Sequence, residues 1–349
     1  MKIINQQRRK DMKKFIILLA LMLSSVAAMA EEKNDTVIIT LQNGTEVRYT
    51  TDEFDRVQII YNLKYGVKVY LKNGKSKDYL ATKVVVAQYH QGGEVVTNHN
   101  RNLYRAKLLE YPHLAEDSTM NQLVIKSTAD YGITFSLEWS YKDKANRWTC
   151  YQMHAGNMQS NVKRKDDFRE DPEIPEQYRS KQSDYDADYD DEFDRGHLCP
   201  SADRLCSREQ NSQTFFFSNM QPQFSKHNQV IWNNFEGKVR DWAGKCDTLY
   251  VVKAATIRSD QVYPDKKLGT LPVPKYFYMA LLQYDKASDS YEAMALWTIH
   301  ENVSITKANF KDYAISIDEL EERTGIDFFC NLPDDIEDKV EKKLDLSKW

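Results

Sequence analysis

One run near the middle of the chain limits its fold and chemistry more than any other stretch, and it reads Asp194-Arg195-Gly196-His197. About thirty residues later, apolar side chains recur at helical spacing over residues 226–243. One stripe of this helix holds Trp232, Phe235, Val239 and Trp242. A helix with one apolar stripe packs on a core, so the sequence predicts a folded domain around this run.

The first thirty residues are typical of a secretory signal peptide. Lys13 and Lys14 precede an apolar run at residues 15–23, and Ala28-Met29-Ala30 provides a small-residue cleavage site before Glu31. A membrane anchor is the competing interpretation, but the apolar run is shorter than the roughly 20 residues that a bilayer requires. We expect residues 1–30 to be removed and the protein to be periplasmic or secreted.

The mature chain would be acidic. The whole chain has a net charge of −4, and the first thirty residues hold six basic residues and one acidic residue, so their removal leaves −9. Affinity for nucleic acid usually depends on Lys and Arg side chains that displace counterions. The overall charge therefore argues against general polyanion binding, and any contact with nucleic acid would need a local basic site.

The cysteine content predicts disulfides and argues against a zinc site. In an oxidising compartment, five cysteines predict one or two disulfides with at least one thiol left over, and the pairing stays open. None of them has the spacing of a zinc-binding pair. They are Cys150, Cys199, Cys206, Cys246 and Cys330.

The N-terminal part is predicted to be a small β accessory domain over residues 31–95, followed by a linker at 96–109. Asn43-Gly44 and Asn73-Gly74 each stand between two β-rich runs, which is the strongest short signal of a hairpin. Each Gly is preceded by Leu-x-Asn and followed five residues later by a Tyr, which indicates a weak internal repeat. The expected strands cover residues 36–41, 45–49, 67–71, 75–80 and 84–86.

Residues 110–349 are predicted to form a larger α+β domain with a central antiparallel sheet. Its expected strands cover residues 122–125, 133–141, 147–153, 248–252, 277–283 and 291–298. Two short helices are expected near the end, at 317–322 and 334–344. The acidic run at 184–194 lacks the Gly and Glu of a calcium-binding EF-hand loop, so we interpret it as a solvated loop.

His197 is the first candidate for chemistry. A single histidine is usually a hydrogen-bonded core or surface residue, but here Arg195 stands two residues before it. A neighbouring guanidinium disfavours the imidazolium form and would keep the ring neutral near pH 7. A neutral imidazole suits a general base, and Arg195 offers a planar donor fork for phosphate.

The predicted helix adds polar groups to this candidate site. Asn228 lies in line with the apolar stripe, where its amide oxygen would suit a hard cation, although it could equally cap the first turn. Glu236 lies about 12 Å further along the helix and roughly 80° around it, so Asn228 and Glu236 could hardly both ligate one ion directly. A carboxylate that reaches metal-bound water fits this spacing and suits Mg²⁺. Arg240 follows one turn later, and the alternative for Glu236 and Arg240 is a surface pair.

Several spaced segments together resemble the DNA/RNA non-specific endonuclease family, the Serratia-type nucleases with a DRGH motif and a ββα-metal (His-Me finger) core. The likeness covers roughly residues 110–335 and leaves out the N-terminal β region. The segments are Asp194 to His197, Ser218-Asn219-Met220-x-Pro222-Gln223, Asn228-x3-Trp232-x3-Glu236-x3-Arg240, residues 273–278 and residues 324–329.

The resemblance implies a role for each matching residue. His197 would activate water, Asn228 would be the single direct ligand of Mg²⁺ (or Mn²⁺), and Glu236 would hold metal-bound waters. Arg195 and Arg240 would neutralise the scissile phosphate, and 5′-phosphate ends would result. Asn219 matches an asparagine that orients the site. A further family arginine would bind substrate, with Arg164 as our candidate and Arg169 as the alternative.

The sequence thus predicts an exported, metal-dependent endonuclease that cleaves DNA and RNA without sugar preference. Two other classes stay open: a nuclease-like binding module with weak catalysis, and a phosphodiesterase that acts on small nucleotides. A base, a cation and arginines do not define the leaving group. A comparison of the digestion of polymers and of dinucleotides would separate the endonuclease from the phosphodiesterase. An inhibitor protein is a further expected partner, and the sequence leaves the oligomeric state open.

Overall fold

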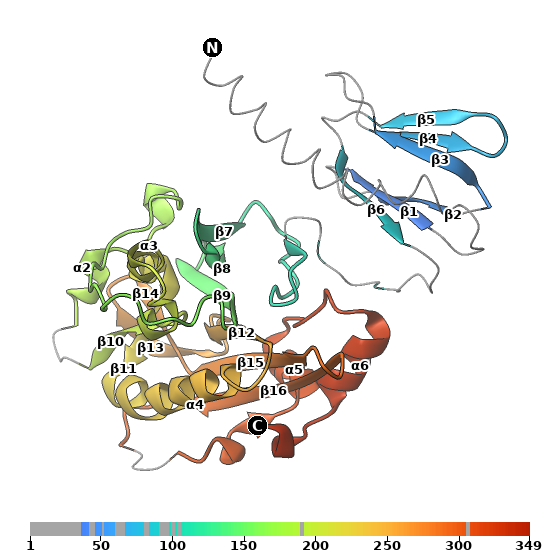
Figure 1. The fold of residues 1–349 in the computed structure, drawn as a ribbon. Coiled ribbons are helices and arrows are strands. Elements are labelled where there is room, and N and C mark those ends of the chain that lie inside the picture. The colour runs from blue at the N-terminus through green and yellow to red at the C-terminus, as the bar shows by residue number, and fades with distance from the viewer. Residues whose placement is uncertain are drawn as a thin grey trace. The chain divides into compact units, whose positions relative to one another are not determined.

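The computed structural model describes residues 36–41, 46–50, 52–59, 67–79, 84–90, 98, 102, 106–188, 192–304 and 308–349. The chain divides into two compact units, one reaching Thr97 and including 103–105, the other containing 98–102 and 106–349 (Figure 1). The predicted signal peptide, the Asn43-Gly44 turn and most of the predicted linker lie outside the described residues.

The described strands of the first unit form two three-stranded antiparallel sheets. One has the order β2-β1-β6 and the other β3-β4-β5. Both expected hairpins are present, since β1 pairs with β2 and β4 with β5. The strands are β1 (Thr36–Leu41), β2 (Glu46–Thr50), β3 (Phe54–Ile59), β4 (Val67–Leu71), β5 (Ser76–Tyr79) and β6 (Val84–His90).

The strand register confirms the internal repeat and extends it to every strand. Val37 pairs with Tyr49 and Tyr89, and Val67 pairs with Tyr79 and Ile59. The matching residues of the two sets are thirty positions apart in each case, Val37 with Val67, Tyr49 with Tyr79 and Ile59 with Tyr89. Each hairpin takes its third strand from the other repeat, because β6 joins β1 while β3 joins β4. The equivalent tyrosines Tyr49 and Tyr79 meet edge to face and share a hydrogen bond between their hydroxyls.

The second unit is built on a seven-stranded antiparallel sheet in the order β17-β16-β15-β12-β9-β8-β7, which confirms the predicted α+β fold. All six strands expected from the sequence are present. The members are β7 (Asn121–Thr128), β8 (Gly132–Ser140), β9 (Ala145–Met153), β12 (Thr248–Ala255), β15 (Tyr276–Asp285), β16 (Ser290–Ile299) and β17 (Ala314–Ile315).

The two faces of this sheet carry separate apolar cores. In β12, Leu249 and Val251 point to the core that includes α4 (Asn233–Ala243), whereas Val252 and Ala254 point to the other. The second core contains apolar residues of α5 (Ile317–Thr324) and α6 (Asp334–Lys342). Alternation also places the charged Lys253 on the α4 side, with no exposed side-chain area.

Two separate two-stranded sheets accompany the seven-stranded sheet. Strands β10 (Phe193–His197) and β11 (Met220–Phe224) pair antiparallel, and β13 (Val262–Leu268) pairs with β14 (Leu271–Pro274). The remaining short helices are α2 (Gln182–Tyr185) and α3 (Arg208–Gln213). Among the described residues, no helix is long and apolar enough to cross a membrane.

Two expectations from the sequence are wrong. The five cysteines all lie in the described part and are free thiols, with Cys150 and Cys199 buried in cores on opposite faces of the sheet. Burial raises the pKa of the Cys199 thiol to about 12, which keeps it protonated and unreactive.

The acidic run at 184–194 is also no simple solvated loop, because buried Asp184 accepts hydrogen bonds from Thr270.

Candidate active site

The predicted central run forms β10, and its partner strand leads directly into the predicted helix. After β11, the chain makes a π-helical turn at His227–Trp232 and continues as α4. Two antiparallel strands followed by a helix therefore enclose one recess of about 570 Å³. Six of the predicted site residues line it: Arg164, Arg195, His197, Asn228, Glu236 and Arg240.

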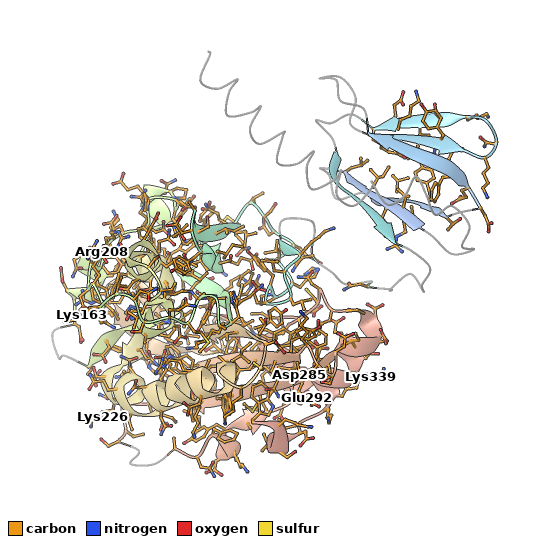
Figure 2. All side chains as sticks on the ribbon, in the orientation of Figure 1. Lys163, Arg208, Lys226, Asp285, Glu292 and Lys339 are labelled. Carbon is orange, nitrogen blue, oxygen red and sulfur yellow. The ribbon has the colours of Figure 1, made fainter. Side chains whose placement is uncertain are left out.

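Exposed basic side chains lie on the part of the second unit that carries this recess. Lys163, Arg208 and Lys226 project at the end of the unit where β10 and the start of α4 lie (Figure 2). The chain is acidic as a whole, so contact with nucleic acid requires local basic side chains, and Arg164, Arg195 and Arg240 line the recess itself.

Gly196 is the residue of the run that permits its close strand pairing. A Cβ atom at this position would lie 2.6 Å from the Cβ atom of Gln223 in β11. Gln223 is itself held in place by a 2.8 Å hydrogen bond with buried His227. The glycine is therefore needed for space and not for an unusual backbone angle.

His197 faces the recess as a neutral ring without a hydrogen-bond partner at Nε2. Its imidazole packs against the rings of Phe168 and Phe215, at centroid distances of 5.7 and 5.2 Å. Burial, followed by the charge of Arg164, lowers the pKa of His197 to about 3. The sequence correctly indicated a neutral ring, but it assigned the cause to the charge of Arg195, which contributes least.

Asn228 is oriented by Asp194, the first residue of the run. The Asn228 side-chain amide donates to Asp194 Oδ2 at 2.8 Å, and Ser225 donates to Oδ1 at 3.0 Å. A carboxylate only accepts hydrogen bonds, so the amide nitrogen faces Asp194 and the amide oxygen is left for the recess. The alternative of a helix cap is wrong, because no side chain caps the π-helical turn.

Glu236 is held by a buried lysine from the sheet. Lys253 Nζ lies 3.4 Å from Glu236 Oε1, and the lysine side chain has no exposed area. Burial raises the pKa of Glu236, and the positive charge of Lys253 is the largest opposing influence. Lys253 thus favours the ionised form of Glu236 at the edge of the recess.

Arg240 pairs with a buried aspartate and not with Glu236. Its Nη1 atom lies 3.0 Å from Asp203 Oδ1, and Tyr151 donates to Asp203 Oδ2 at 2.8 Å. The alternative of a surface pair between Glu236 and Arg240 is therefore wrong. The guanidinium keeps further donors that can face the recess.

Arg164 and Arg169 occupy different places. Arg164 lines the recess, donates to Ser201 Oγ at 3.0 Å and lies over the ring of Phe215 at 4.9 Å. Arg169 instead donates to backbone carbonyls and lies over Phe216 outside the recess. The geometry favours Arg164 as the substrate-facing arginine.

Asn219 is brought near the recess but does not line it. Its buried amide accepts from the backbone of Cys199 at 2.9 Å and donates to Cys199 and Thr214 carbonyls. It therefore braces the segment that follows His197 and is a positioning residue.

Sequence reasoning missed three supporting residues: Asp194, Asp203 and Lys253. Asp194 stood inside the singled-out run, and Lys253 is the only charged residue of the otherwise apolar strand β12. An isolated charge in a buried strand is a detectable signal, because such a charge needs a partner. Asp203 carries no comparable local signal.

Comparison with known proteins identifies a family of nucleases. The family model for DNA/RNA non-specific endonucleases matches residues 118–335. A nuclease from Nostoc sp. is 31% identical over 231 residues, which cover 64% of this chain and 79% of that protein. Nuclease C1 from Cunninghamella echinulata is 27% identical over 213 residues, covering 57% and 81% respectively.

A solved structure shows the same fold. The complex of EndoG with EndoGI matches with a TM-score of 0.50 and 22% identity, over 60% of this chain and 86% of that one. The chain belongs to the DNA/RNA non-specific endonuclease family. It is therefore a hydrolase that acts on nucleic acids, and the resemblance inferred from its motifs is confirmed.

We predict that Gly196→Ala destabilises the protein by about 1–3 kcal/mol, because the added methyl group overpacks against Gln223. Nuclease activity should fall with it, since the displaced strand carries His197. Urea unfolding measures the first effect. Gly237→Ala is the matched control: its Cβ would meet nothing within 4 Å, and alanine should gain up to about 1 kcal/mol in the helix. Equal stability of the two variants would contradict the prediction.

We predict that Lys253→Met lowers nuclease activity by about 10- to 100-fold, as expected for a residue that orients a site carboxylate. Loss of the ammonium removes the largest influence that lowers the pKa of Glu236, so that pKa rises further. The acid limb of the pH–activity profile should therefore move to higher pH. Lys238→Met, at an exposed position of α4, is the control. An unmoved acid limb would show that Lys253 supports packing alone.

Proposed function

We propose that this protein is an exported, metal-dependent endonuclease that hydrolyses DNA and RNA without sugar preference. One observation carries the proposal: a neutral His197 with an unpartnered Nε2 faces the same recess as the amide oxygen of Asn228. A general base must be unprotonated near neutral pH and within reach of a water molecule. His197 meets the first condition because burial lowers its pKa to about 3.

The donor groups of the recess suit a hard divalent cation. Asn228 and Glu236 offer only oxygen atoms, and among the described residues no close trio of His, Cys, Asp or Glu forms at the recess. A cation with one protein ligand keeps most of its waters, which is the habit of Mg²⁺ and is compatible with Mn²⁺. When bound, it would stabilise negative charge on the leaving 3′-oxygen.

The remaining steps fall to the side chains. His197 Nε2 accepts a proton from water as the water oxygen bonds to phosphorus. The bond from phosphorus to the 3′-oxygen breaks, the 3′-oxygen takes a proton from solvent water, and the other end keeps a 5′-phosphate. Arg195, Arg240 and Arg164 line the same recess and would bind the phosphate oxygens. Arg195 lies over the Phe168 ring at 4.2 Å, which fixes its guanidinium plane.

An inhibitor protein is part of the proposal. The solved relative EndoG forms a complex with EndoGI that explains EndoG inhibition. We extend to this chain the idea that a partner covers the recess, because an unregulated nuclease would threaten the cell that makes it.

We predict that the mature chain cleaves plasmid DNA and RNA with Mg²⁺ or Mn²⁺ and not with EDTA. His197→Ala should lose about 10²- to 10⁴-fold in rate, the usual contribution of a general base. His154→Ala, outside the recess, is the control and should keep full activity. Agarose gels and 5′-end labelling measure cleavage and end chemistry.

Each alternative has its own result in that experiment. Binding of DNA with no cleavage under any divalent cation would establish a nuclease-like binding module. Cleavage of dinucleotides but not of polymers would establish a small-molecule phosphodiesterase.

We predict that export removes residues 1–30. N-terminal sequencing of protein from the periplasm or the medium should begin at Glu31. Ala30→Phe should block processing, because the cleavage site needs small residues, and the precursor should accumulate. Recovery of an unprocessed chain from the cytoplasm alone would refute export.

A further inference from the structure

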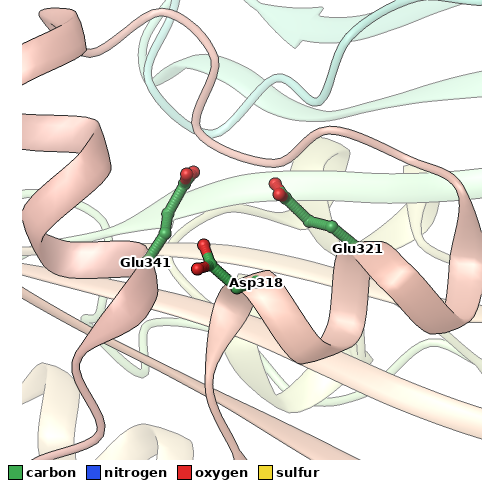
Figure 3. A group of neighbouring side chains, drawn as sticks. All are labelled: Asp318, Glu321 and Glu341. Carbon is green, nitrogen blue, oxygen red and sulfur yellow. The ribbon is translucent and has the colours of Figure 1, made fainter.

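The helices α5 and α6 meet through carboxylates on the face of the sheet opposite α4. Asp318 and Glu321 come from α5 and Glu341 from α6 (Figure 3). One carboxylate oxygen from each lies within 4.8 Å of the others. Ile317 and Val340, the sequence neighbours of Asp318 and Glu341, belong to the apolar core on this face of the sheet. Two packed helices therefore meet through side chains of the same charge.

A second trio shares its central member with the first. Asp327, Glu337 and Glu341 also present carboxylate oxygens within 4.8 Å of one another. Glu337 and Glu341 are one helical turn apart, where like charges repel. Glu341 thus stands at the centre of five carboxyl groups.

The burial of Glu341 makes this arrangement costly. Only 7% of the residue is exposed, and its Oε1 atom is buried without a hydrogen-bond partner. Figure 3 shows its carboxylate directed toward the gap that Glu321 also faces. Burial and the neighbouring carboxylates raise the pKa of Glu341 to about 10 and that of Glu321 to about 8. A carboxyl oxygen that is buried without a hydrogen-bond donor, as Glu341 Oε1 is, needs a proton or a cation beside it.

We propose that Asp318, Glu321 and Glu341 bind a calcium ion that joins α5 to α6. Three carboxylates from two helices match the preference of Ca²⁺ for several oxygen ligands in flexible geometry. Mg²⁺ is a poorer match, because it usually takes one or two carboxylates and keeps its waters. The absence of Cys and His from both trios removes the ligands that zinc prefers.

This site is separate from the nuclease recess. It lies among residues of the α5 and α6 core, whereas the recess lies beside α4. The proposal therefore does not rest on the proposed function. The bound Ca²⁺ would have a structural role, because it would hold α6 to α5 on this face of the sheet.

The test uses the mature chain with Asn228→Ala, so that Ca²⁺ binding in the nuclease recess does not obscure the titration. Isothermal titration with Ca²⁺ should show one site per chain, and Ca²⁺ should raise Tm by several degrees over EDTA-treated protein. Adding Glu341→Gln should weaken Ca²⁺ binding at least tenfold and remove the rise in Tm. In EDTA, this variant should be as stable as its parent or more so, because glutamine is neutral without the proton that Glu341 must take up on folding at neutral pH.

Two further variants keep the test decisive. Asp318→Asn, at a partly exposed position, should weaken Ca²⁺ binding even if Glu341→Gln does not fold. Glu322→Gln removes an exposed carboxylate of the same helix and should keep the full response. A Tm that ignores Ca²⁺ would overturn the proposal and leave protonated carboxyls as the explanation. A response that survives both Glu341→Gln and Asp318→Asn would overturn it as well.

Discussion

The recess depends above all on the carboxylate of Asp194. It accepts from Ser225 and Asn228 at 3.0 and 2.8 Å, and from Gln229 at 3.0 Å, so one side chain joins β10 to the turn that begins the helix. A longer hydrogen bond adds to this link, since Trp232 Nε1 in the turn donates to the carbonyl oxygen of His197 at 3.4 Å. Because the carboxylate cannot donate, it also decides which way the asparagine amide points.

Buried ion pairs set the charges around that link. Lys253 supports Glu236, and Asp203 supports Arg240, so each charged recess side chain of α4 has an opposite charge behind it. Such pairs add little net stability, because removing charges from water costs about as much as their attraction returns. Their value lies in position: each fixes a charged side chain whose other atoms face the recess.

The sequence predicted what depends on neighbours along the chain. His197, Asn228, Glu236 and the sheet were all found, because motif spacing and hydrophobic periodicity report on local structure. It failed where the partner comes from a distant segment, as Lys253 does for Glu236 and Asp203 for Arg240. The disulfide expectation failed similarly, since residue counts do not show that Cys150 and Cys199 lie in separate cores. Nor does composition show that the first turn beside Asn228 is π-helical.

The exchanged strands of the first unit bear on how such a unit can arise. Its two repeats share one register, yet β3 completes the sheet of the second repeat and β6 that of the first. One repeat alone would present an unpaired strand and a sheet lacking its third member, which favours association with a second copy. The unit has the topology of a strand-swapped homodimer joined into one chain.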